Sequence, residues 1–185
     1  MSNVSISDWR VWARADTAPG DTVVQAAINA AEELVGDLTA RYFTVATGTE
    51  STRTYVPTPG DPVLRIHDCV GVTVVTDDGA TLTAGVDYQL EPVGANWSGT
   101  ARPYTQIRRL GGTLWTLDDG KATASVDGDW GWTALPGRYT LAVKMLVDAS
   151  ISEFNSTGVL APPKVTAEIA EWLVSLRRVE SWGIA

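Results

Sequence analysis

The only histidine and the only cysteine of the chain, His67 and Cys69, flank Asp68. Three such residues in a row could ligate a metal ion or pair a thiol nucleophile with a base. A zinc site needs three or four ligands at fixed spacing, and a chain with one His and one Cys does not provide them. Neighbouring residues of a strand also point to opposite faces, which separates a nucleophile from its base. We therefore expect no metal, no cofactor and no catalytic residue here.

Pairs of carboxylates could support acid–base chemistry or bind calcium. The chain has three such pairs: Asp77/Asp78, Asp118/Asp119 and Asp127/Asp129. The first two precede glycine in turn-like sequences, where Asp is favoured for its backbone hydrogen bonds. The third lacks the ligand spacing and closing Glu of a calcium loop. No G-x-S-x-G elbow, P-loop or dinucleotide fingerprint occurs, so the sequence predicts a protein that is not an enzyme. A small hydrolase using the carboxylate pairs remains an alternative without an assembled site.

Eight tryptophans are many for 185 residues. On an exposed sheet they could form a stacking platform for a sugar, so a carbohydrate-binding β module is a second alternative. Such a module predicts that a sugar quenches the tryptophan fluorescence. The other interpretation is that most of these residues anchor the core or a protein interface. The two basic doublets, Arg108/Arg109 and Arg177/Arg178, are typical of solvated faces or ion pairs.

The elements that would position these residues belong to a globular chain, with 44% hydrophobic and 19% charged residues. No apolar run is long enough to cross a membrane, and no secretory signal is recognisable. One cysteine permits no intrachain disulfide, which fits a reducing cytosol or a particle assembled in one. The net charge of -8 argues against broad binding to nucleic acid.

Apolar residues recur at helical spacing near both ends of the chain. We expect helices at residues 7–15, 22–42, 136–154 and 164–179, with Asp21 as the N-cap of the second. Pro136 suits the first position of the third helix, where a missing N–H has no consequence.

Short β-prone runs separated by Gly, Pro and Asp fill residues 52–132. Two of the breaks, "TDDGAT" and "LDDGKA", have the Asp-Gly of a tight hairpin turn. The order of elements predicts an α+β fold, a helical bundle or hairpin with an inserted small antiparallel β-sheet or barrel. We divide the chain into an N-terminal helical segment (1–50), a β subdomain (51–132) and C-terminal helices with a tail (133–185).

The stretch "VDGDWGW" forms the expected joint between strand and helix. Trp130 and Trp132 are two residues apart, so on a strand they share a face. Gly131 leaves the opposite face open to close backbone approach, and Gly128 breaks the preceding run. The helix then starts at Pro136. We expect both tryptophans to be at least partly buried and to clamp the β subdomain onto the helices.

Several stretches, taken in order, are similar to those of a known family. These stretches are "VDGDWGW" with "ALP" and a helix behind it, "INAAEELVGDLTARYF", "TRTYVP" with the strands up to "YQLEPV", and "RPYTQIRRL". Together they resemble the head–tail connector (adaptor) proteins of tailed phages. The likeness covers most of the chain and rests on order and spacing. It does not include "SDWRVWARAD" or "ESWGIA".

The resemblance implies a structural protein of the virion neck, assembled in the cytoplasm of the host bacterium. Such adaptors usually form a twelvefold ring of identical subunits between the portal protein and the tail or a stopper (head-closure) protein. DNA passes through the ring without specific binding, and no membrane is involved. An acidic lumen would let DNA slide without sticking, which fits the net charge of this chain.

In such adaptors the C-terminal segment docks on the portal, here residues 164–185. Trp172 and Trp182 are the expected anchors at the portal or at a neighbouring subunit. Arg177 and Arg178 suit bidentate pairing with carboxylates of the partner. The tail after the helix would order on docking. Alternatively, the helix only completes the bundle core and the tail frays in solvent.

Overall fold

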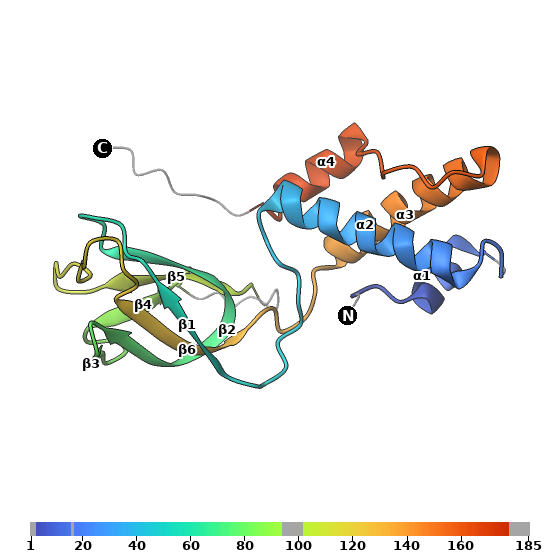
Figure 1. The fold of residues 1–185 in the computed structure, drawn as a ribbon. Coiled ribbons are helices and arrows are strands. Elements are labelled where there is room, and N and C mark those ends of the chain that lie inside the picture. Colours follow the sequence, from blue (N-terminus) through green and yellow to red (C-terminus); the bar gives the residue numbers. More distant parts are fainter. Residues whose placement is uncertain (1–2, 16, 94–101, 178–185) are drawn as a thin grey trace. The chain divides into compact units, whose positions relative to one another are not determined.

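The computed structural model describes residues 3–15, 17–93 and 102–177 (Figure 1). The chain forms two compact units. The helical unit comprises Met1–Phe43 and Leu135–Ala185, and the β unit comprises Thr44–Ala134. Helices and an antiparallel sheet are thus segregated along the chain, which confirms the predicted α+β class. Among the described residues, no helix has the length and apolar character needed to span a membrane.

The first helix of the helical unit is α1 (Ile6–Ala13). The Ser5 hydroxyl accepts from the backbone N–H of Asp8 at 3.0 Å and caps its N-terminus. Arg14 takes a left-handed conformation and ends it, slightly earlier than the expected residue 15. Trp9 is fully buried, whereas Val11 and Trp12 are exposed.

Helix α2 (Asp21–Thr39) has the predicted apolar face, and two expectations at its ends were wrong. The N-cap is Gly20, not Asp21. The Asp21 carboxylate lies in the first turn and accepts from the Arg10 guanidinium at 2.8 Å. At the other end Ala40 turns left-handed (φ 53°), and the N–H of Arg41 returns to the carbonyl of Gly36 at 3.2 Å. This closing pattern ends the helix before residue 42.

Helix α3 (Gly137–Thr157) starts one residue later than expected. Pro136 has an extended ψ of 135° and is the N-cap. Its carbonyl accepts from the backbone N–H groups of Tyr139 at 2.9 Å and Thr140 at 3.2 Å. The helix also runs past residue 154 and ends where Gly158 adopts a φ of 73°. After a loop, the short α4 (Ala167–Val174) completes the helical unit.

The core of the helical unit lies between α2 and α3, and the N-terminal segment is fastened to it. One carboxylate oxygen of Glu32 accepts from the backbone N–H groups of Asn3 at 2.8 Å and Val4 at 2.9 Å. The Phe43 and Tyr139 rings stack at 4.3 Å between centroids. Burial raises the pKa of Tyr139. Asn3 and Val4 are therefore part of the packed structure.

The β unit is an open, antiparallel six-stranded sheet of order β1-β6-β2-β5-β4, with β3 paired to β2. The strands are β1 (Ser51–Tyr55), β2 (Val63–Asp77), β3 (Ala80–Thr81), β4 (Tyr88–Glu91), β5 (Tyr104–Arg109) and β6 (Ala124–Trp130). The register of β2 shifts at several points. Because bulges bend a strand, β2 curves, and both of its ends lie on one side of the unit, to the left in Figure 1.

Both predicted Asp-Gly turns are confirmed. Asp78 (φ 48°) and Gly79 (φ 79°) join β2 to β3, and Asp119 (φ 41°) and Gly120 (φ 79°) form the second turn. Positive φ at both central residues is the mark of the hairpin turn that matches strand twist. The interior of the sheet packs as one apolar cluster: Leu64, Ile66, Cys69, Val75, Tyr88, Ile107, Trp115, Ala124, Val126 and Trp130.

Candidate partner-binding site

Helix α4 carries the described part of the predicted partner-binding segment. Thr166 caps it, with its hydroxyl accepting from the N–H of Ile169 at 3.3 Å, so the helix begins later than the expected residue 164. Its regular part ends at Val174, before the expected residue 179. Ile169 and Leu173 are buried in the helical core, whereas Trp172 is half-buried. The helix therefore completes the core with one side and exposes part of the other.

Ser175, the first residue after α4, is held by a short network. The Arg138 guanidinium donates to the Ser175 hydroxyl at 2.9 Å, and that hydroxyl donates to the carbonyl of Trp172 at 2.7 Å. Arg177 follows in an exposed turn. The structure thus brings Trp172 and Arg177 to the C-terminal end of α4. The other two predicted residues, Arg178 and Trp182, lie outside the described residues.

Trp130, the first tryptophan of the expected joint, ends β6 within the β unit. Its indole N–H donates to the carbonyl of Ser51 at 2.7 Å. The Arg53 guanidinium lies over the ring at 4.5 Å, a favourable cation–π geometry. The rings of Tyr55 and His67 surround it, each with its centroid 6.3 Å away. Trp130 is only 9% exposed, as predicted.

Trp132 is also buried, at 4% exposure, but its surroundings differ from those of Trp130. Strand β6 ends at Trp130, and Gly131 has a φ of 127°. The shared face expected from a continuous strand therefore does not apply to the pair. The Trp132 indole N–H donates to the buried carboxylate of Asp68 at 3.2 Å. The expected close approach at Gly131 is present, because the backbone of Thr44 fills the space of a side chain there.

The expected break at Gly128 was wrong, because this residue lies inside β6. A β-carbon at Gly128 would lie 2.8 Å from the carbonyl oxygen of Gly71 and 3.0 Å from the Cys69 sulfur. Glycine thus lets the irregular part of β2 pack closely on β6. The clamping of the β subdomain onto the helices by this joint, with Pro136 as its helical end, stays a prediction.

His67 and Cys69 lie in different environments. Cys69 is fully buried, and its thiol donates to the carbonyl of Gly71 at 2.8 Å. Burial raises the pKa of this thiol to about 11, so it is protonated at neutral pH. His67 is exposed, with Nδ1 3.0 Å from the hydroxyl of Tyr55. Within the described residues, no group of three or more His, Cys, Asp or Glu side chains is placed to hold a metal ion.

The tryptophans of the β unit do not offer a sugar platform within the described residues. Trp115, Trp130 and Trp132 are all buried, so their faces are not available for stacking. Trp97 lies outside the described residues. The arrangement supports the interpretation of these residues as core anchors.

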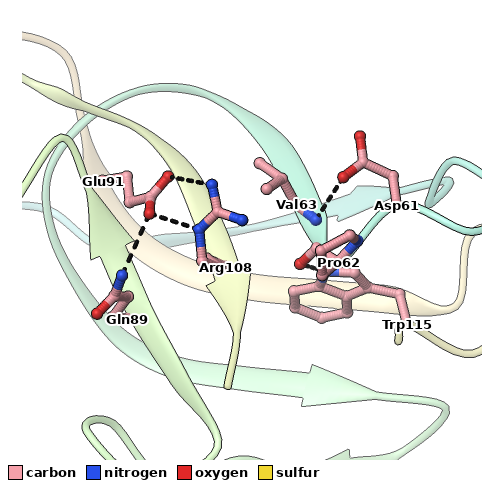
Figure 2. Close-up of polar contacts among 7 residues, drawn as sticks. All are labelled: Asp61, Pro62, Val63, Gln89, Glu91, Arg108 and Trp115. Atoms are coloured by element: carbon pink, nitrogen blue, oxygen red, sulfur yellow. Dashed lines mark hydrogen bonds and ion pairs between the residues drawn. The ribbon is translucent and has the colours of Figure 1, made fainter. Parts of the chain in front are cut away.

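The doublet Arg108/Arg109 forms ion pairs, one of the two interpretations that the sequence allowed. Arg108 on β5 holds Glu91 on β4 through Nε–Oε1 at 2.6 Å and Nη2–Oε2 at 3.3 Å, and Gln89 donates to the same carboxylate at 3.2 Å (Figure 2). This hydrogen bonding raises the pKa of Arg108. Arg109 points elsewhere and is buried near Asp77. Because side chains alternate along a strand, the sequence could have predicted that the two arginines point to opposite faces. Their partners could not be predicted, because they depend on the strand register.

Comparison with solved structures connects this fold to virion necks. The chain is similar to one in the neck of an empty gene transfer agent (GTA) particle computed with C6 symmetry, with a TM-score of 0.62 and 16% identity over 97% of this chain and 92% of that one. It is similar to one in the neck of the native GTA particle computed with C12 symmetry, with a TM-score of 0.58 and 17% identity over 96% and 90%.

A chain of the virion of the native GTA particle is similar to the same degree, with a TM-score of 0.61 and 16% identity over 97% and 92%. No family model matches the sequence, and no curated protein matches it. The likeness extends over both units of the chain, and it establishes a shared fold.

Proposed function

We propose that this chain is a structural protein of a virion neck, an adaptor that forms a ring of identical subunits between the portal and the tail or stopper. The observation that carries the proposal is the shared fold with neck chains over 97% of this chain and 92% of the other. A match along nearly the whole of both chains supports a shared architectural role more strongly than a match of one unit would. Fold alone does not define function, so the proposal also draws on the surface of this chain.

A ring of identical subunits needs two different, complementary surfaces on each copy, so that successive contacts close. The neck structures that this chain resembles were computed with C6 and C12 symmetry. Those symmetries support a closed ring of the present chain, for which the family resemblance implies twelve copies. DNA passes through the ring in this proposal, and the net charge of -8 opposes tight contact between phosphates and the wall.

The segment 164–185 makes the portal contact or the contact to a neighbouring subunit in this proposal. Val174 is 68% exposed, Trp172 retains exposed area, and the exposed, cationic Arg177 follows just after the helix. An aromatic anchor together with an arginine is the composition of a binding hot spot. Arg178 and Trp182 are included from the sequence alone.

Deletion of Glu180–Ala185 tests the contact, because it leaves α4 intact. We expect the truncated protein to fold as before, while filled heads lack the adaptor ring and fail to join tails. A second variant, Arg177→Glu, should weaken co-sedimentation with portal-bearing heads, and Arg65→Glu at an exposed position of β2 serves as the matched control. Wild-type occupancy of the truncated protein on heads would exclude the tail as the docking element.

The proposal includes no catalytic step and no cofactor. The protonated, buried thiol of Cys69 and the exposed His67 give no nucleophile paired with a base. Replacement of both residues, His67→Ala with Cys69→Ser, should leave particle assembly intact. Loss of infectivity with a correctly folded double variant would contradict this part of the proposal.

A further inference from the structure

The loops on the side of the β unit where both ends of β2 lie expose apolar side chains. Val86, Leu114 and Leu117 are 70%, 50% and 48% exposed. We call them, together with the exposed carboxylates Asp78, Asp118 and Asp119, the loop surface.

Hydrogen bonds join the segments that carry the loop surface. The N–H of Leu110 donates to the carbonyl of Asp87 at 2.9 Å, which links the loop of Val86 to the segment after β5. The Thr123 hydroxyl donates to the carbonyl of Thr116 at 2.6 Å. The N–H of Asp78 donates to the carbonyl of Thr123 at 2.9 Å. These hydrogen bonds therefore hold the loops next to one another.

A buried charge pair holds the segment that contains Leu114 and Leu117. The Asp77 carboxylate accepts from the N–H of Thr116 at 3.1 and 3.3 Å. The Arg109 guanidinium lies 4.0 Å from that carboxylate and 5.5 Å from the centre of the Trp115 ring. The Trp115 indole N–H donates to the carbonyl of Pro62 at 3.0 Å (Figure 2). Both charged side chains are at least nine-tenths buried. The contacts of this pair hold a segment that has no regular secondary structure.

The two Asp-Gly turns, which carry the carboxylates of the loop surface, also have a fixed geometry. We call these three carboxylates the rim. Each has the left-handed conformation at both central residues, Asp78–Gly79 and Asp119–Gly120. A surface that is already ordered loses little conformational entropy when a partner binds. Apolar side chains that stay exposed on adjacent, fixed loops favour a protein interface over a solvated loop.

The charge of the rim selects the kind of partner. The three exposed carboxylates of the loop surface lie in the β2–β3 turn and the β5–β6 loop, and Lys121 in the second turn is already paired with Asp118 at 2.8 Å. Nucleic acid and an anionic membrane would be repelled. A second copy that presented the same surface would also be repelled, because like charges would face each other.

We infer that the loop surface docks a different protein, whose contact surface is basic around apolar residues that meet Leu114 and Leu117. This inference rests on the proposed function, in which the partner is another component of the same neck or tail. Complementary charge would steer the encounter, and the apolar contact would hold it.

A photo-crosslinking residue in place of Leu117, in purified particles, tests the inference. We expect a covalent adduct with a different protein chain, and the crosslinked peptide of that chain should carry more Lys and Arg than Asp and Glu. The same probe at the exposed Val159 of the helical unit is the control and should not yield that adduct. An adduct with a second copy of this chain, with DNA or with lipid, or no adduct, would overturn the inference.

A charge-neutral variant isolates the role of the rim. Asp78→Asn, Asp118→Asn and Asp119→Asn together keep the shape of the turns, because Asn also tolerates the left-handed conformation. With the Leu117 probe, this variant should lose most of the adduct, roughly tenfold at physiological salt, while its thermal melt stays unchanged. An undiminished adduct would contradict the electrostatic part.

The amount of this chain in the same particles separates the two proposals. If the chain is absent from particles, the proposed function fails and this inference fails with it. If the chain is present in wild-type amount and Leu117 contacts DNA or another copy, only this inference fails.

Discussion

The backbone N–H of Trp132 donates to the carbonyl of Thr44 across 2.8 Å, and the carbonyl of Trp132 accepts from Ala46 at 2.9 Å. The first and last segments of the β unit are thereby paired as a short parallel bridge. Gly131 makes this pairing possible, because its φ of 127° and its missing side chain admit the backbone of Thr44. The glycine between the two tryptophans is thus an architectural residue of the β unit.

Gly131→Ala should destabilise the protein strongly. The new β-carbon would overlap the backbone around Thr44, and the φ is unfavourable for any L side chain. Backbone strain and a steric clash together predict a loss of about 2–5 kcal/mol in the free energy of unfolding. Urea unfolding followed by tryptophan fluorescence measures the loss.

Gly137→Ala is the matched control for this change. Gly137 begins α3, and nothing lies within 4 Å of a β-carbon built there. We expect this variant to unfold at the wild-type urea concentration or slightly above it. If the two substitutions lowered the free energy of unfolding equally, the close approach at Gly131 would not be important for stability.

Trp130→Ala should lower the free energy of unfolding by about 3–5 kcal/mol, because it removes a large core side chain. Trp130→Phe keeps most of the packing and removes the hydrogen bond to Ser51, so its effect should be about 0.5–1.5 kcal/mol. Thermal unfolding measures both. If Trp130→Ala melted within about a degree of wild type, the residue would be a surface ligand platform instead.

Asp77→Ala should be much more damaging than Asp118→Ala. Without Asp77, the buried guanidinium of Arg109 loses the carboxylate beside it, which predicts a loss of about 3–5 kcal/mol. Asp118 forms an exposed pair with Lys121, and such pairs contribute only about 0–1 kcal/mol. Chemical unfolding of the two variants compares them directly, and similar midpoints would contradict the bracing role of Asp77.

The stability of the protein should fall as the pH rises above 9. The pKa of Cys69 is raised from 9.0 to about 11 by burial, so between these values the unfolded chain loses its thiol proton while the folded chain keeps it. Stability is then full below pH 9, falls toward pH 11, and the thiol contributes about 2–3 kcal/mol to the change. Because Tyr88 and Tyr139 also have raised pKa values, the Cys69 contribution is the difference between wild type and Cys69→Ala. If the stabilities of the two proteins changed in parallel between pH 9 and pH 11, this contribution of Cys69 would be refuted.

The sequence predicted those elements that depend on local chemistry. The apolar spacing of α2 identified its buried face, and the two Asp-Gly pairs identified turns whose residues have positive φ. The end of α2 was missed because Ala40, which has no special preference for the left-handed conformation, adopts it. Tertiary contacts outweigh local preference at that point.

The side chains that depend on distant contacts were not predictable from the sequence. Asp77 and Asp78 are neighbours of the same type, but Asp77 is buried against Thr116 and Asp78 is exposed in the turn. Gly128 was expected to break a strand, and it is instead the point where β2 packs on β6. Each outcome follows from strand register, which pattern alone does not fix.

Electron cryo-microscopy of the neck of the purified particle tests the central claim most directly. The proposal predicts a closed ring between portal and tail, in which each subunit has density for the helical unit and the β unit described here. Density for this chain elsewhere in the particle, or a neck ring built entirely from other proteins, would contradict the proposed function.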